Sequence, residues 1–327
     1  MYIVKNKIFL FKKNKMKNKK VIVTGAGGFI GSHLCEMLLE NDNEVIAIDS
    51  YEYGKNNNLN HIKERLVLIE RRVQDINWLQ LLKDNTIDAI FNLASLNMNI
   101  SMIDPILDLR TNVEGILAIL EAIRKHSLDI PIIHSSTGSV YGEPINQTQN
   151  EDHPKNPTSP YGVSKLSAEN YLQLYYLLYR QKFVGLRYYN IYGPRQYDGE
   201  TGGVIPIFIN NALYDREFTI TGDGEQARCF TYVKDIASVN LRAFEINKSG
   251  FYNVAHNTIT NINELAKTIL YITNKDLPIR HIEERLGEIL RFNPDTTMLN
   301  VDFNLGCETT LKEGLEITIE YYKNKEM

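Results

Sequence analysis

A tyrosine and a lysine one helical turn apart, Tyr161 and Lys165, are residues whose types and spacing could do chemistry. They follow Ser159 and Pro160, a pair typical of a helix N-cap and first helical position, so both side chains would lie on one face of a helix. A phenol with a pKa of about 10 is a poor base at neutral pH, and a nearby ammonium favours its phenolate. Many such pairs are solvated helix surface, so catalysis requires a cofactor beside them.

The stretch "VIVTGAGGFIGS" supplies Gly25, Gly28 and Gly31 between an expected strand and an expected helix. Glycines at this place let the backbone approach a pyrophosphate at the helix N-terminus, and the third permits close packing of helix on sheet. Asp49 ends the next strand, "EVIAID", where a carboxylate can accept hydrogen bonds from an adenosine ribose. Its charge would repel a 2′-phosphate, so NAD is favoured over NADP; the alternative is that Asp49 only caps a turn.

The elements that must position these residues follow an alternating pattern. From Val21, short β-branched runs alternate with longer amphipathic stretches, which predicts an α/β fold: a doubly wound parallel (Rossmann) sheet covered on both faces. After "FVGLRYYN", glycines and prolines mark loops that predict a smaller C-terminal substrate-binding lobe. The expected domains are a disordered, lysine-rich leader at 1–18, an NAD-binding Rossmann domain at 19–187 to which 231–260 returns, and a lobe formed by 188–230 and 261–327.

Composition excludes several classes of function. The chain has 327 residues and a net charge of −4, so it has no overall basic field for nucleic acid. Its three cysteines are far apart and form no metal-ligand cluster or disulfide framework, which fits a reducing cytoplasm. No apolar run reaches the ~20 residues needed to cross a bilayer. The leader shows no cleavage site, and Met16 is an alternative start.

The sequence resembles the extended short-chain dehydrogenase/reductase family, specifically its nucleotide-sugar epimerases and dehydratases. The resemblance runs from about Lys19 nearly to the C-terminus and rests on the ordered motifs "TGAGGFIGS", "NLAS", "SSTGSVYGE", "PYGVSK", "LRYYNIYGPRQ", "GDGEQARCFTYVKDIA" and "RLGEILRF". It implies that Tyr161 is the catalytic acid/base and that Lys165 binds the nicotinamide ribose while lowering the tyrosine pKa. It also implies that Thr137 bonds the reacting sugar oxygen, although a hydroxyl there could instead bond its own turn.

The resemblance also implies the positions that contact the two ligands. Asp75 and Ile76 would contact adenine, Tyr188 would lie beside the nicotinamide, and Asn112 would brace the active-site backbone. Further cofactor contacts are expected at Phe29, Ile30, Leu93, Ala94, Ser95 and Ser135. Asn190, Arg228 and Arg285 would hold a nucleotide diphosphate, because guanidinium groups suit phosphate oxygens. Cys229 stands where the family usually has Asp, which leaves the hydrogen bonding of Arg228 open.

Val204 and Phe292 are expected at the sugar pocket. A bulky ring at the position of Phe292 tends to exclude an N-acetyl group at C2 in the 4-epimerases that this chain resembles. A non-acetylated hexose or hexuronic acid is therefore the expected sugar, and the alternative is that Phe292 only packs between the lobes.

The residues after Thr137 bear on the reaction. Dehydratases of the family carry Asp-Glu there and decarboxylases carry Glu at the second place, whereas this chain has Gly138 and Ser139. The expected activity is therefore C4 epimerisation of a nucleotide-diphosphate sugar through a 4-keto intermediate, with NAD recycled. The enzyme is expected to need no metal and to be a homodimer. The alternatives are a nucleotide-sugar reductase, a C2 or C3/C5 epimerase, a 4,6-dehydratase, or a non-catalytic NAD-binding regulator.

Overall fold

The computed structural model describes residues 16–52, 58–199, 202–246, 248–283 and 293–325. At its centre is a seven-stranded sheet in the order β11-β6-β5-β4-β1-β2-β3, in which every neighbouring pair is parallel. The strands are β1 (Lys20–Thr24), β2 (Glu44–Asp49), β3 (Leu66–Glu70), β4 (Ala89–Asn92), β5 (Ile132–Thr137), β6 (Phe183–Tyr188) and β11 (Gly250–Val254). This confirms the doubly wound sheet, and the strand order reverses between β1 and β4, where such sheets bind ligands.

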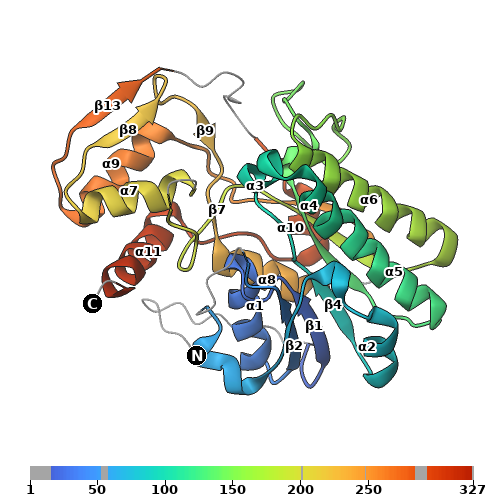
Figure 1. Ribbon diagram of the computed structural model, residues 1–327. Coiled ribbons are helices and arrows are strands. Elements are labelled where there is room, and N and C mark those ends of the chain that lie inside the picture. The colour runs from blue at the N-terminus through green and yellow to red at the C-terminus, as the bar shows by residue number, and fades with distance from the viewer. Residues whose placement is uncertain (1–15, 53–57, 200–201, 247, 284–292, 326–327) are drawn as a thin grey trace.

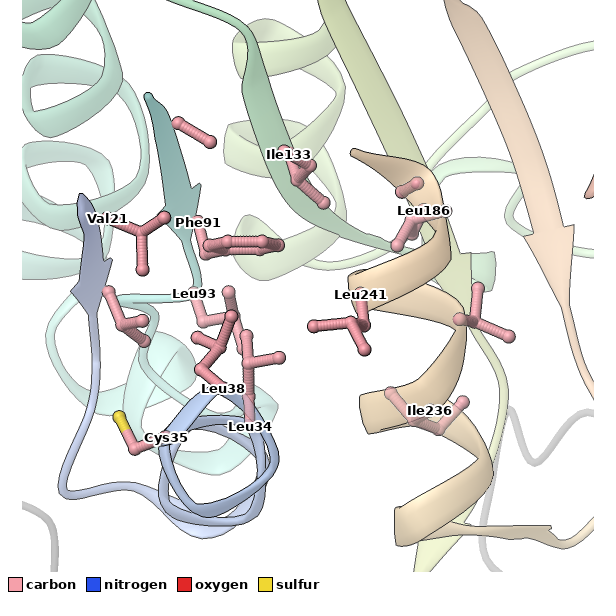
Figure 2. Packing of buried hydrophobic residues seen from close by; sticks show 14 of the residues in the cluster. Val21, Leu34, Cys35, Leu38, Phe91, Leu93, Ile133, Leu186, Ile236 and Leu241 are labelled. Atoms are coloured by element: carbon pink, nitrogen blue, oxygen red, sulfur yellow. The ribbon is translucent and has the colours of Figure 1, made fainter. Parts of the chain in front are cut away.

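Helices cover both faces of the sheet (Figure 1). One face carries α1 (Phe29–Glu40), α8 (Val233–Ala243) and α10 (Thr297–Phe303), and the other carries α2 (Trp78–Asp84), α5 (Gly115–Lys125) and α6 (Pro160–Tyr179). Figure 2 shows how helix and sheet pack on this face. Leu34 and Leu38 of α1 and Leu241 of α8 lie beside Phe91 of β4 and Leu93, which follows β4. Burying each such side chain stabilises the fold by about 1.5–3 kcal/mol.

A smaller lobe has its own hydrophobic core. It is built from α7 (Val204–Leu213), α9 (Ile262–Thr273), α11 (Leu311–Lys325) and the parallel pair β8 (Phe218–Thr221) and β13 (Ile279–Ile282). In Figure 1 it lies at the upper left, beside the carboxyl ends of the central strands. Two short pairs connect it to the sheet domain: β7 (Ile191–Tyr192) with β10 (Thr231–Tyr232), and β9 (Ala227–Arg228) with β12 (Thr260–Asn261).

The chain crosses between the two units several times. After β10, α8 and β11 return to the sheet domain, where β11 pairs with β6. The later helix α10 also packs there, on β11 and α8, so the interval 261–327 does not lie wholly in the lobe. Met16, placed in the predicted leader, is buried in the same core, so the folded domain begins before Lys19.

The segment before α5 is a nearly continuous helical run. It consists of α3 (Met98–Ile103), α4 (Pro105–Leu109) and a π-helical turn, η3 (Arg110–Glu114), and it packs along α6. The short 3₁₀ turns are η1 (Asn60–Arg65), η2 (Val73–Asp75) and η4 (Gly138–Val140). Within the described residues, no helix combines the length and apolarity that crossing a bilayer requires.

Candidate active site

A cleft of about 570 Å³ opens at the carboxyl ends of the central strands, where the strand order reverses. Its walls come from the glycine-rich turn after β1, the ends of β2, β4, β5 and β6, and the start of α6. The predicted residues that line it are Gly25, Gly28, Phe29, Ile30, Gly31, Asp49, Leu93, Ala94, Ser95, Ser135, Tyr161 and Tyr188. Residues far apart in the sequence therefore face one cavity large enough for a dinucleotide.

The glycine-rich turn has no room for side chains. Gly25 has a φ of +67°, and a Cβ there would lie 2.8 Å from the backbone of Leu93 and Ala94. A Cβ on Gly31 would lie 2.1 Å from the carbonyl oxygen of Gly25, so the helix packs directly on the turn. Gly28 is the N-cap of α1 and no side chain caps that helix, which leaves its N-terminus available to an anion. This cradle fits the diphosphate of a dinucleotide.

Asp49 caps the glycine-rich turn and also lines the cleft. Its carboxylate accepts hydrogen bonds from the backbone N–H groups of Gly27 at 2.9 Å and Tyr51 at 2.8 Å. Burial raises the pKa of Asp49, and these backbone donors act in the opposite direction. The geometry is therefore compatible with both interpretations of this residue, the structural cap and the ribose contact.

The Tyr161–Lys165 pair sits in the first turns of α6, whose N-cap Ser159 accepts a hydrogen bond from the Gly162 N–H at 3.1 Å. Tyr161 lines the cleft, and Lys165 is buried with its Nζ donating to the carbonyl oxygen of Ser135 at 2.8 Å. Burial lowers the pKa of Lys165 to about 8. The pair lies as the sequence pattern suggests, but the lysine is directed at the end of β5.

The phenol of Tyr161 is shaped mainly by burial. Burial raises its pKa to about 12, while hydrogen bonds with the side chains of Thr137 and Ser95 lower it. The Lys165 nitrogen lies 5.9 Å from the centre of the tyrosine ring. Desolvation therefore outweighs the hydrogen bonds that the protein itself gives this phenol, and the lowering of its pKa by Lys165 stays a prediction. A cationic nicotinamide would supply charge that favours the phenolate.

Thr137 makes the turn bond that the sequence left open as the alternative, and its bond to the reacting sugar oxygen stays a prediction. Its Oγ1 accepts a hydrogen bond from the Ser139 N–H at 3.1 Å, which makes it the cap of η4, and its side chain also bonds Tyr161. Gly138 is enclosed, because a Cβ there would lie 2.3 Å from the ring of Tyr189. The Thr137–Ser139 turn thus places the Thr137 hydroxyl beside Tyr161 and leaves no space at Gly138 for an acidic side chain.

Some predicted cofactor residues do not line the cleft. Arg72, Val73 and Gln74 line the cleft at this place. Asp75 and Ile76, which come next in the chain, do not line it, because the chain turns away from the cleft within η2. Asn112 is buried behind α6, where its Nδ2 donates to Asp108 and Ser164, at 2.8 and 2.9 Å.

The predicted substrate residues lie toward the smaller lobe. Asn190 follows β6 with a φ of +40°, Arg228 lies in β9 and donates to the Ala227 carbonyl at 2.9 Å, and Val204 begins α7. None of these lines the 570 Å³ cleft. Cys229 is buried beside Tyr189. Arg285 and Phe292 lie outside the described residues.

Sequence reasoning missed a loop that closes one side of the cleft. Arg195, Gln196, Tyr197, Gly202 and Gly203 line it from the segment after β7. Arg195 donates to Glu36 of α1 at 2.6 Å, which ties this loop to the cofactor-binding helix. The signal was the "GPRQ" in one of the family motifs, to which no role was assigned.

The fold and the cleft are those of a Rossmann enzyme that binds a dinucleotide, and Tyr161 lies in the wall of that cleft. Residues 21–255 match the NAD dependent epimerase/dehydratase family, and the chain belongs to it. The resemblance inferred from the sequence motifs is thereby confirmed, and NAD is the cofactor that the glycine-rich cradle fits.

Individual relatives are similar over nearly the whole chain. A putative UDP-glucose 4-epimerase of Methanocaldococcus jannaschii is 38% identical, across 93% of this chain and 98% of its own length. The crystal structure of UDP-glucose 4-epimerase with UDP-glucose from Thermotoga maritima has a TM-score of 0.89 at 33% identity, covering 94% of this chain and all of that one. A UDP-N-acetylglucosamine 4-epimerase of Methanobrevibacter ruminantium, in complex with UDP-N-acetylmuramic acid, has a TM-score of 0.89 at 34% identity, covering 94% and 99%.

Proposed function

We propose that the protein is an NAD-dependent 4-epimerase of a UDP-linked sugar. The observation that carries the proposal is the hydroxyl-rich turn at Thr137, which bonds Tyr161 and is followed by Gly138 and Ser139. Elimination of water across C5 and C6 needs an additional acid and base, and this turn supplies neither. Oxidation and reduction at one carbon need only a residue that exchanges the hydroxyl proton.

Each residue then has a defined task. Tyr161 takes the proton of the C4 hydroxyl and later returns a proton to the same oxygen. Thr137 hydrogen-bonds that oxygen and keeps the phenol in position. Lys165 donates to the nicotinamide ribose and, as an ammonium, favours the phenolate. The glycine-rich turn at Gly25, Gly28 and Gly31 would hold NAD, which would supply the acceptor for the C4 hydride and its return to the opposite face of the 4-keto sugar.

The nucleotide-diphosphate end of the substrate is assigned to the smaller lobe. Asn190 and Arg228 lie there at the carboxyl side of the central sheet, and Arg285 is the second guanidinium proposed for the phosphates. The uridine base is supported by the relatives, whose names specify UDP-sugars. Val204 and Phe292 are proposed to border the sugar.

The test is to incubate the protein with UDP-, GDP-, CDP- and dTDP-sugars and to resolve the products by NMR. We expect a UDP-sugar to equilibrate with its C4 epimer while added NAD shows no net reduction. Steady consumption of reduced cofactor would indicate a reductase, and inversion at C2, C3 or C5 would indicate another epimerase. Either result would contradict the proposal.

We further propose that the enzyme is a homodimer. Large apolar side chains are exposed along α3, α4 and the neighbouring face of α6, and such a surface favours association. These side chains are Met102, Ile103, Ile106, Leu109, Val163, Leu174, Leu177 and Leu178. Light scattering after size-exclusion chromatography should give twice the 37.6 kDa chain mass, and Ile106→Glu should give the monomer. A wild-type monomer would contradict this assignment.

The proposed location is the cytoplasm. The three cysteine thiols, Cys35, Cys229 and Cys307, are buried, which suits a protein that stays reduced.

A further inference from the structure

A buried carboxylate lies against α6, the helix that carries Tyr161 and Lys165. Asp108 of α4 is only 1% exposed, and its described hydrogen-bond partners are neutral. Its Oδ2 accepts from the Ser164 hydroxyl at 2.5 Å, and its Oδ1 accepts from Asn112 Nδ2 at 2.8 Å. A buried carboxylate with neutral partners is costly unless a positive charge lies near.

The local backbone brings Asp108 against the turn that carries the Tyr161–Lys165 pair. Ser164 immediately precedes Lys165, and its hydroxyl also lies 3.0 Å from the carbonyl oxygen of Tyr161. The π-helical turn η3 places Asn112 against the same serine, at 2.9 Å. Turns of this kind are rare and are often found at functional sites. Asp108 is therefore attached, through Ser164, to the backbone between the two catalytic side chains.

The titratable groups that face Lys165 come from three elements, α6, β5 and α4. Glu169, one turn later in α6, is already paired with Arg187 of β6 through contacts of 2.8 and 2.7 Å. His134 of β5 is neutral, because burial holds its pKa well below the usual value. Asp108 is thus the carboxylate beside Lys165 whose own described partners carry no charge. Both Asp108 and Glu169 raise the pKa of Lys165 against desolvation, and the effect of Asp108 is the larger.

We propose that Asp108 is a positioning residue of the Tyr161–Lys165 pair, which holds the helix turn through Ser164 and provides the buried negative charge that keeps Lys165 an ammonium. Without that charge, Lys165 would lose its proton at a lower pH. The protein would then lose both a donor to the cofactor ribose and the positive charge that favours the Tyr161 phenolate. The catalytic consequence rests on the proposed function, whereas the charge of Lys165 does not.

The direct test is Asp108→Asn with lysine labelled by ¹³C at Cε, and Lys165→Met assigns the Lys165 resonance. Asparagine fits the site, because its Oδ1 can accept from Asn112 Nδ2 while its NH₂ donates to the Ser164 hydroxyl, which can donate in turn to the carbonyl oxygen of Tyr161. We expect the titration midpoint of Lys165 to fall by at least about one pH unit, since an opposite charge nearby shifts a pKa by about that much or more. An unchanged midpoint would overturn the proposal.

Asp235→Asn is the matched control. Asp235 is a half-buried carboxylate that also accepts from neutral groups, the Thr309 hydroxyl and N–H, and it lies outside the cleft. Its replacement should leave the Lys165 midpoint in place. A downward shift as large as that of Asp108→Asn would show a general effect of lost charge and would also overturn the proposal.

Two further variants separate position from charge. Ser164→Ala removes the hydrogen bond that positions the helix turn, so it should lower kcat about tenfold. It keeps the Asp108 carboxylate, so the titration midpoint of Lys165 should not change. Asp108→Glu should restore the midpoint that Asp108→Asn lowers. If Asp108→Asn does not fold, Ser164→Ala decides, and wild-type kcat in that variant contradicts the proposal. If the wild type epimerises no UDP-sugar, the proposed function fails, but the titration still tests Asp108.

Discussion

Lys165 donates to the carbonyl oxygen of Ser135 at 2.8 Å, which joins the start of α6 to the end of β5. The ammonium is thereby held beside the strand that ends at Thr137, under Ser135, which lines the cleft. The contact orders the lysine in the protein alone, so the ribose contact proposed for it would cost less side-chain entropy.

Lys165→Ala should weaken NAD binding at least about tenfold, because it removes a charge-assisted donor to the ribose. Isothermal titration calorimetry with NAD measures the change. Lys182→Ala, which removes an exposed lysine paired with Asp129, is the control and should bind normally. An unaltered Kd in the Lys165 variant would mean that this lysine does not contact the cofactor.

Tyr161→Phe should fold and bind NAD but lose at least about a thousandfold in kcat. General acid/base groups contribute factors of about 10² to 10⁴, and the phenol is the proton carrier in the proposed reaction. Turnover of the UDP-sugar and a parallel NAD titration measure both properties. Turnover close to wild type would refute the assigned mechanism.

Asp49→Ala should narrow the preference for NAD over NADP, since it removes a negative charge that repels a 2′-phosphate. It should also destabilise the fold by about 1–3 kcal/mol, because the N–H groups of Gly27 and Tyr51 lose their acceptor. Asp49→Asn keeps an acceptor and removes the charge, so it should show the altered preference with a smaller loss of stability. Binding ratios that stay constant in both variants would place the selectivity elsewhere.

Phe292→Ser should shift the ratio of kcat/KM for UDP-N-acetylglucosamine over UDP-glucose upward by about tenfold to a hundredfold. The reason is that overfilling a packed site costs about 1–3 kcal/mol. Similarity both to a UDP-glucose and to a UDP-N-acetylglucosamine 4-epimerase leaves the sugar open to this measurement. A wild-type preference for the acetylated sugar, or a kcat/KM ratio that the variant does not change, would show that Phe292 does not exclude the N-acetyl group.

The fold should lose stability on acidification from pH 6.5 towards 4. Burial and the nearby Arg195 guanidinium lower the pKa of His33 from 6.5 to about 4, and its Nε2 lies 2.9 Å from the Pro194 carbonyl oxygen. Between pH 6.5 and pH 4 the unfolded chain binds a proton that the folded chain does not. The free energy of unfolding therefore decreases as the pH is lowered. Urea unfolding at pH 7 and pH 5 measures this. His33→Gln should reduce the dependence, and an identical slope would show that His33 does not contribute.

Several features of the protein could be predicted from the sequence because they depend on neighbouring residues. The glycines of "TGAGGFIGS" were assigned to a tight turn, and Gly25 has the positive φ that favours glycine. Ser159 was predicted to cap a helix, and its side chain accepts from the Gly162 N–H. The β-branched runs predicted strands buried on both faces, and the central sheet has that character.

The tertiary structure decided what depends on long-range contacts and burial. Arg72 and Val73 line the cleft and Asp75 does not, because the chain turns away from the cleft within η2. The loop at Arg195 meets α1 across 159 residues of sequence, and Asp108 meets Ser164 across 56. Sequence periodicity reports which face of an element is apolar, but it does not report which distant element covers that face. Desolvation, which depends on that packing, raises the pKa of Tyr161 and lowers the pKa of Lys165.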